Sequence, residues 1–111
     1  MVRKVRWSRS AQVDLREIFE YISESTPLNA YRLAEKIRFA AETLDTMSER
    51  GRVIPEFEDR SLREIFVSKY RIMYKVLEQE IIIAAVVHMS RELRNIFPST
   101  NDYPDLRLSL L

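Results

Sequence analysis

The sequence of 111 residues contains no cysteine, one glycine and one histidine. Without cysteine there is no disulfide and no thiolate zinc site, and a single histidine leaves few ligands for any other transition metal. We therefore expect no metal or cofactor, and a reducing cytoplasm fits the composition. No apolar run approaches the roughly 18 residues of a membrane span, and none follows the basic N-terminus as in a signal peptide. A soluble, unprocessed protein is expected.

Hydrophobic residues make up 46% of the chain and charged residues 32%, a composition typical of one folded domain. The net charge of +1 is unevenly distributed. Residues 10–49 carry eight acidic and four basic side chains, whereas residues 1–9 carry four basic side chains and no acidic one. This asymmetry favours an anionic partner for the part of the chain outside residues 10–49.

The first half of the chain predicts a short strand and two helices. Apolar and charged residues alternate from Val2 to Trp7, as in a strand. Either Ser8 or Ser10 can cap the helix that follows, because a serine hydroxyl can accept a hydrogen bond from the first turn. Apolar residues recur in this helix at spacings of four, three and four, which places them on one stripe; they are Ala11, Leu15, Ile18 and Ile22.

A second helix is expected to begin at Thr26 and Pro27, a capping residue followed by a proline at the first helical position. Its apolar stripe consists of Ala30, Ala34, Ile37, Ala41 and Leu44, widened by Leu33, Ala40 and Met47. Gly51 stands where this pattern stops, and we interpret it as the left-handed residue that ends the helix. Two stripes of the same period predict an antiparallel helical hairpin.

After Gly51 the hydrophobic period becomes two, which predicts a three-stranded antiparallel meander over residues 62–67, 70–77 and 81–88. Residues 52–57 are expected to be irregular because Pro55 interrupts any ladder, and residues 58–61 to form a turn. The last strand is apolar on both alternating sets, so it should be central and covered on both faces.

The predicted fold is therefore α+β, with a small antiparallel sheet of about four strands, made mixed by the N-terminal strand, and a two-helix hairpin packed on it. Residues 91–97 could add a helical turn, followed by a loop, and we cannot place the last six residues. We divide the chain into a domain of residues 1–94 and a C-terminal extension, residues 95–111, of unknown structure.

Four segments of the chain resemble the RelE/ParE toxin superfamily when taken in order. They are WSRSAQVDLREIFEYI, GRVIPEF, LREIFVSKYRIMYKV and IIIAAVVHMSR, and the resemblance covers roughly Arg3 to Arg91. The resemblance implies a RelE/ParE-like fold and the toxin of a type II toxin–antitoxin module, a plasmid-stabilisation system, neutralised by a cognate antitoxin protein. Residues 95–111 extend beyond the pattern.

Toxins of this superfamily act in two ways, and the resemblance leaves both open. RelE-type toxins cut messenger RNA on the ribosome, whereas ParE-type toxins poison DNA gyrase. The VVHMSR segment resembles ParE-type members more closely, so the leading hypothesis is a gyrase-inhibiting toxin in a toxin–antitoxin hetero-oligomer. The alternatives are a ribosome-dependent mRNA interferase, and a non-toxic member that only binds its partner.

Metal-free RNA cleavage needs a base, an acid and cations around the phosphate. The candidates for these roles are Glu56, His88, Arg71 and Arg91. Of these, Glu56 and Arg71 resemble catalytic positions of some nuclease members. Met89 and Ser90 stand where such members carry a histidine or tyrosine, which leaves the set incomplete.

Three of the four catalytic candidates, His88, Arg71 and Glu56, also have a structural interpretation, which we favour for the individual residues. His88 ends an apolar strand as a structural side chain would. Arg71 should point away from the face shared by Tyr70 and Ile72, exposed or in an ion pair, and Glu56 could tie its loop to a nearby arginine, Arg52 or Arg60.

Four basic residues of the second half are the candidates for binding a target or partner: Arg60, Arg63, Lys69 and Lys75. Trp7, Tyr70 and Tyr74 are expected in or beside the core and not as base-stacking platforms. Glu58 and Asp59 resemble part of a magnesium site, but without a third carboxylate nearby a turn is favoured.

Overall fold

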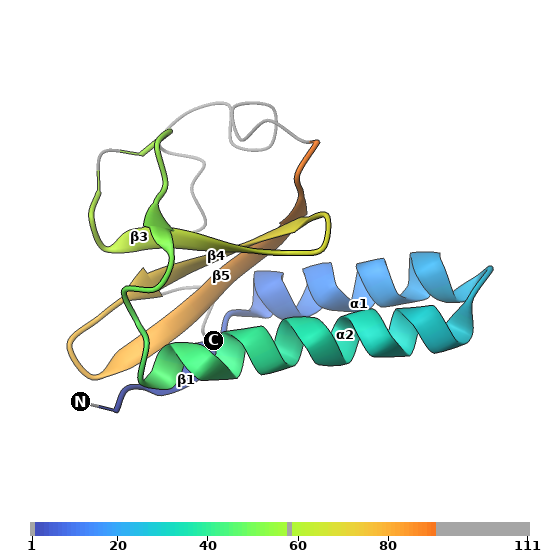
Figure 1. Ribbon diagram of the computed structural model, residues 1–111, viewed down its shortest axis with the longest axis horizontal. Helices are drawn as coiled ribbons and strands as arrows, with labels where there is room; N and C mark the ends of the chain where they lie inside the picture. Colours follow the sequence, from blue (N-terminus) through green and yellow to red (C-terminus); the bar gives the residue numbers. More distant parts are fainter. Residues whose placement is uncertain (1, 58, 91–111) are drawn as a thin grey trace.

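The computed structural model describes residues 2–57 and 59–90 (Figure 1). Its elements are β1 (Lys4–Trp7), α1 (Arg9–Ser23), α2 (Pro27–Glu42), the 3-10 helix η1 (Thr43–Asp45), β2 (Arg52–Val53), β3 (Leu62–Val67), β4 (Tyr70–Val76) and β5 (Glu80–His88). The two long helices run side by side as a hairpin, and the sheet lies against them (Figure 1). This arrangement confirms the predicted α+β class and the helical hairpin.

The sheet has five strands in the order β1-β5-β4-β3-β2. β1 pairs in parallel with β5, and the other pairs are antiparallel, which makes the sheet mixed as predicted. The prediction of about four strands missed β2, because Arg52 and Val53 are too few residues to show an alternating pattern. These two residues pair with Glu64 and Arg63 of β3.

β5 lies between β1 and β4, and all residues from Ile81 to Val87 are buried, as its apolar sequence predicts. A bulge interrupts its pairing with β4: Met73 pairs with Ala85 and Tyr74 with Ile83, so the residue between them on β5 is left over. The carbonyl of that residue, Ala84, accepts a hydrogen bond from the Ser8 hydroxyl at 3.1 Å.

The two faces of the sheet have separate apolar clusters. The helix-side core combines helical residues with strand residues that face the helices: Ala11, Leu15, Ala34, Ile37, Ala40, Ala41, Leu44, Ile65, Val67, Ile72, Tyr74, Ile81, Ile83 and Val86. Trp7 and Tyr70 pack against this core and Tyr74 is fully buried, which confirms the core role predicted for these aromatic residues. The opposite face carries a smaller cluster of Ile54, Met73, Ala85 and Val87.

The helix starts differ from each other in their capping. Ser8 caps α1, because its hydroxyl oxygen accepts the Ala11 N–H at 3.0 Å. Pro27 is the first residue of α2 and Thr26 occupies the N-cap position, both as predicted, but the Thr26 side chain makes no capping hydrogen bond. The Thr26 hydroxyl instead donates to the carbonyl of Ile22, at 3.5 Å, in the preceding helix.

The interpretation of Gly51 as a left-handed helix end is wrong. η1 ends at Asp45, and Gly51 has no positive φ. A Cβ atom built there would lie 2.5 Å from the Tyr74 hydroxyl and 2.6 Å from the carbonyl oxygen of Glu64. The Gly51 N–H donates to that hydroxyl at 2.9 Å, and the hydroxyl donates to the carbonyl of Ser48 at 2.8 Å. Glycine is thus needed here for close packing.

Gly51→Ala is expected to destabilise the protein by about 1–3 kcal/mol, because the added methyl group must push apart the Tyr74 ring and the β3 backbone. Urea denaturation followed by circular dichroism measures the change. Glu49→Ala, two residues earlier and exposed, serves as the control and should leave the midpoint close to wild type. A Gly51→Ala midpoint equal to that of the control would contradict the packing role.

Several smaller expectations have mixed outcomes. Met47 does not widen the buried face of the hairpin, since it is 48% exposed. The turn before β3 forms through Asp59, whose carboxylate accepts hydrogen bonds from the backbone N–H and the hydroxyl of Ser61. The helical turn expected over residues 91–97 and the division at residue 94 lie outside the described residues. No helix in the described part of the chain is long and apolar enough to cross a membrane.

Candidate functional site

Arg71 lies on the sheet face opposite the helices. Its strand neighbour Ile72 is in the helix-side core, and successive side chains of a strand point to opposite faces, so the predicted orientation of Arg71 is confirmed. On the same face, β3 contributes Glu64 and β2 contributes Arg52, which are paired residues in the β2–β3 ladder. Three adjacent strands thus converge on one charged group.

The Arg71 cluster consists of Arg52, Glu56, Glu64 and Arg71, joined by hydrogen-bonded ion pairs. Arg71 donates from Nε to Glu64 Oε1 at 2.5 Å. It also donates from Nη1 and Nη2 to the two carboxylate oxygens of Glu56, at 3.2 and 3.3 Å. The second oxygen of Glu64 accepts a hydrogen bond from Arg52 Nε at 2.7 Å. Every donor nitrogen of Arg71 therefore has a carboxylate partner.

Burial divides the cluster into an inner and an outer pair. The side chains of Glu64 and Arg71 are 0% and 8% exposed, whereas those of Glu56 and Arg52 are 40% and 57% exposed. Burial alone would lower the pKa of Arg71, but the hydrogen bonds to Glu64 and Glu56 outweigh it and raise the pKa. Arg71 is thus a permanent cation with a fixed orientation.

Glu56 closes the outer side of the cluster as a charged carboxylate. Partial desolvation would raise the pKa of Glu56, but the hydrogen bonds and positive charge of Arg71, assisted by Arg52, lower it below the usual value. Its loop is held near the sheet because Ile54, two residues earlier, is fully buried in the smaller apolar cluster. The ion pair with Arg71 replaces the predicted tie to Arg52 or Arg60.

Acid is expected to remove the contribution of Glu56 to stability. Because its folded pKa lies below the ordinary value of 4.5, the unfolded chain takes up the proton first. The stabilisation is fully present above about pH 4.5 and is lost as the pH falls through the folded pKa. Glu56→Gln should therefore lower stability at neutral pH, by less than about 1 kcal/mol because the carboxylate is partly exposed. The urea midpoints of wild type and Glu56→Gln should differ at neutral pH and converge near pH 3. A difference between the two proteins that is the same at both pH values would contradict this linkage.

Sequence reasoning missed Glu64, the most buried member of the cluster. Its signal was a carboxylate in the strand LREIFV, on the alternating set whose other members, Leu62 and Phe66, are apolar. A buried acid in a strand needs a cationic partner, and Arg71 lies close to it across the β3–β4 ladder. The pattern therefore indicated an ion pair, although it could not identify the partner.

His88 does not join the Arg71 cluster. It pairs across β4 and β5 with Tyr70, which packs against the helix-side core, and the two rings meet edge to face at 5.3 Å. Its Nδ1 lies 2.7 Å from the hydroxyl of Ser90. Of the four catalytic candidates, the structure thus brings only Glu56 and Arg71 together, while Arg91 lies outside the described residues.

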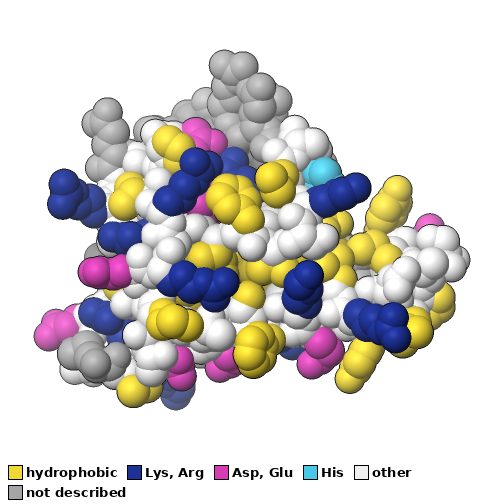
Figure 2. All heavy atoms as spheres, in the orientation of Figure 1, with side chains coloured by type: hydrophobic (Ala, Val, Ile, Leu, Met, Phe, Trp, Pro, Cys, Tyr) yellow, Lys and Arg dark blue, Asp and Glu magenta, His cyan; other side chains and the backbone are white. Residues whose placement is uncertain are grey.

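The four basic residues expected to bind a target or partner are dispersed. Arg63 donates to the carbonyl of Gly51 at 2.8 Å, and Lys75 lies near Asp59, whose pKa is lowered mainly by hydrogen bonds from Ser61 and also by this lysine. Arg60 and Lys69 are exposed. Figure 2 shows lysine and arginine side chains scattered among acidic and apolar ones on the viewed face, without one continuous basic patch. The binding role of these residues stays a prediction.

The exposed border of the site contains an aromatic–cation contact. The Arg52 guanidinium lies over the ring of Phe66, 5.1 Å from its centre, and this ring is 44% exposed. Within the described ranges, no three histidine or acidic side chains are grouped closely enough to hold a metal ion.

Comparisons with known proteins agree with this architecture. Residues 5–93 match the family model described as the ParE toxin of the type II toxin–antitoxin system parDE. Toxin RelE2 of Caulobacter vibrioides is 35% identical over 89 residues, covering 79% of this chain and 97% of the relative.

Two solved structures share the fold. One is a chain of the chromosomal ParDE system of P. aeruginosa, with a TM-score of 0.69, 20% identity and coverage of 80% of this chain and 98% of the other. The second is from the RelBE2 toxin–antitoxin complex of Mycobacterium tuberculosis, with a TM-score of 0.57, 22% identity and coverage of 79% and 99%. The fold is that of the RelE/ParE toxin superfamily. The chain belongs to the ParE toxin family of type II toxin–antitoxin systems.

Proposed function

We propose that this toxin inhibits DNA gyrase by binding it, without cleaving RNA, and that a cognate antitoxin neutralises it in the cytoplasm as a hetero-oligomer. The observation that carries the proposal is the mutual neutralisation of the Arg71 cluster. Both carboxylates already accept hydrogen bonds from arginine, and all donor nitrogens of Arg71 are occupied.

Cleavage of RNA would require more than this cluster offers. A general acid must protonate the leaving oxygen, and a base must take the proton of the attacking hydroxyl. Glu56 is held as a carboxylate, so it could serve only as the base, and His88 is on the other face of the sheet. A toxin that acts by binding needs neither group, which favours the gyrase hypothesis.

A gyrase supercoiling assay tests this proposal. Purified toxin is expected to block supercoiling and to trap the enzyme's cleaved-DNA complex, and Glu56→Gln should retain this inhibition because no proton transfer is involved. The matched control is the same toxin premixed with its antitoxin. Wild-type toxin that leaves supercoiling unchanged while arresting growth would overturn the gyrase target.

A second candidate is a ribosome-dependent endoribonuclease that cuts messenger RNA. It is favoured by the 35% identity to a relative named Toxin RelE2 and by the bidentate pairing of Glu56 with Arg71. In this case Glu56 would act as the base and Arg71 would stabilise the phosphate, with His88 and Arg91 as the further candidates. Mapping of messenger RNA ends after induction should then show cuts that disappear in Glu56→Gln. Normal growth during strong expression without antitoxin would instead indicate a non-toxic binding member.

A further inference from the structure

The end of the helical hairpin exposes large apolar side chains. In Figure 1 the joined ends of α1 and α2 extend past the edge of the sheet. This hairpin end, residues 17–31, runs from the second half of α1 to the start of α2. Its exposed apolar side chains are Phe19, Tyr21, Leu28 and Tyr31, of which Tyr21 is 76% exposed. Figure 2 shows hydrophobic side chains projecting at this end of the molecule. Exposed tyrosines are typical anchors of protein interfaces.

The hairpin end is also acidic. Residues 17–31 include Glu17, Glu20 and Glu24 but no lysine or arginine. All three glutamates are exposed, and their spacings of three and four place them on one stripe, opposite the buried stripe of Ala11 and Leu15. Like charges at these spacings repel each other, and negative charge near a helix C-terminus is unfavourable. None of the three forms an ion pair within the described part of the chain. The stripe therefore lowers stability, and an external cation would relieve it.

The connection between the two helices is held in a fixed conformation. The backbone N–H groups of Ser25 and Thr26 both donate to the carbonyl of Ile22, at 3.2 and 2.9 Å. The Ser23 hydroxyl donates to the carbonyl of Glu20 at 3.0 Å. A surface that is ordered before binding loses less conformational entropy when a partner docks. The hairpin end is thus preorganised for binding.

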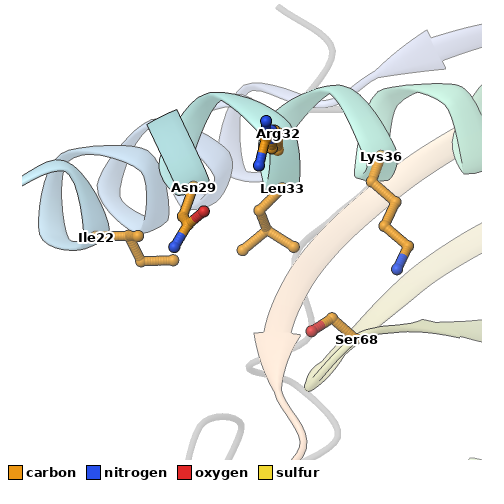
Figure 3. Close-up of a pocket in the computed structure, with 6 residues that line it drawn as sticks. All are labelled: Ile22, Asn29, Arg32, Leu33, Lys36 and Ser68. Atoms are coloured by element: carbon orange, nitrogen blue, oxygen red, sulfur yellow. The ribbon is translucent and has the colours of Figure 1, made fainter. Parts of the chain in front are cut away.

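Two cations of α2 leave the acidic stripe without compensation. Arg32 and Lys36 contribute to a pocket of about 320 Å³ between the hairpin and the β3–β4 turn (Figure 3). In Figure 3 the Lys36 side chain extends toward Ser68 of this turn. The pocket also includes Ile22, which lies on the buried stripe of α1, so the pocket and the acidic stripe are on different sides of that helix. Neither cation forms an ion pair within the described residues.

We propose that the hairpin end is the surface by which this toxin binds its target protein, and that it fits an apolar groove bordered by lysine and arginine side chains. This inference rests on the proposed function, because it names the surface that contacts gyrase. Charge complementarity identifies the occupant. An enzyme that acts on DNA needs cations to hold the phosphates, so gyrase is expected to offer such a groove. A second copy of the chain would bring two acidic stripes together, and RNA would be repelled.

Neutralising the stripe is the first test. Glu17→Gln/Glu20→Gln/Glu24→Gln is expected to weaken binding to purified gyrase about tenfold or more at low salt, measured by titration calorimetry, and to make binding less dependent on salt. Its matched control makes the same change of charge at exposed positions outside the hairpin end: Glu42→Gln/Glu49→Gln/Glu78→Gln. This control should bind within about threefold of wild type. An equal loss in both triple variants would reduce the effect to net charge and overturn the surface.

Removing the tyrosines tests the apolar part without changing the charge. Tyr21→Ala/Tyr31→Ala is expected to weaken gyrase binding about tenfold or more at low and high salt alike. Phe39→Ala/Met47→Ala removes two exposed apolar side chains outside the hairpin end and should bind within about threefold of wild type. Circular dichroism and urea midpoints close to wild type show that each variant is folded.

The two levels of the proposal fail in different ways. Wild-type affinity for gyrase in both the glutamine triple variant and the tyrosine double variant would overturn the hairpin end as the docking surface, while gyrase would remain the target. Wild-type toxin that does not bind gyrase at all would overturn the proposed target and the surface together.

Discussion

Replacing Arg71 by methionine is expected to lower the free energy of unfolding by about 3–5 kcal/mol, because it leaves the carboxylate of Glu64 buried with too little compensating charge. Glu64 has no exposed side-chain area, and its remaining partner Arg52 contacts it from the solvent side. Urea denaturation at neutral pH measures the loss.

Two further variants show that the loss arises from the buried charge. Arg52→Met removes a cation that is 57% exposed and should cost less than about 1 kcal/mol. Glu64→Leu/Arg71→Met removes both buried charges and should recover a large part of the stability lost in the single variant, since a buried ion pair is often replaceable by apolar residues. A double variant as unstable as Arg71→Met would contradict this explanation.

Leu44→Ala is expected to destabilise the protein by about 2–5 kcal/mol, the range for cavities left by leucine in a close-packed core. Leu44 follows α2 in η1, is fully buried and belongs to the helix-side core. Thermal and urea unfolding both measure the effect. Leu28→Ala, in the first turn of α2 and 59% exposed, is the matched control and should change stability little. Equal losses in both variants would place Leu44 outside the core.

These stability effects decide how toxicity variants should be interpreted. Loss of toxicity in Arg71→Met could follow from unfolding alone, whereas Glu56→Gln changes a partly exposed side chain and leaves the inner ion pair intact. Glu56→Gln is therefore the better variant for separating gyrase binding from RNA cleavage. Inhibition that survives it favours binding, and cleavage that disappears favours the nuclease.

The periodic elements could be predicted from the sequence because their patterns are local. The stripe from Ala11 to Ile22 and the strand from Leu62 to Val67 have the predicted positions. The orientation of Arg71 also followed from alternation along a single strand. Errors occurred where the pattern was too short, as in β2, or where a residue type has two possible roles, as with Gly51.

The candidate site was only half predictable. Glu56 and Arg71 were named as a pair from family resemblance, and the structure brings them together. Glu64 was missed, and His88 was grouped with residues that lie on the opposite face. The residues that Glu64 and His88 contact come from other strands, so nothing within a short window of sequence identifies these partners.

The sequence by itself determined the helical hairpin and the three long strands that follow it, because these depend on spacing between near neighbours. Only the tertiary structure decided that Gly51 makes room for Tyr74, that Arg71 is fully paired, and that Arg32 and Lys36 have no partner within the described residues. Each of these facts depends on which distant segments come into contact. The same residue type, arginine, is therefore fully paired at position 71 and has no partner within the described residues at position 32.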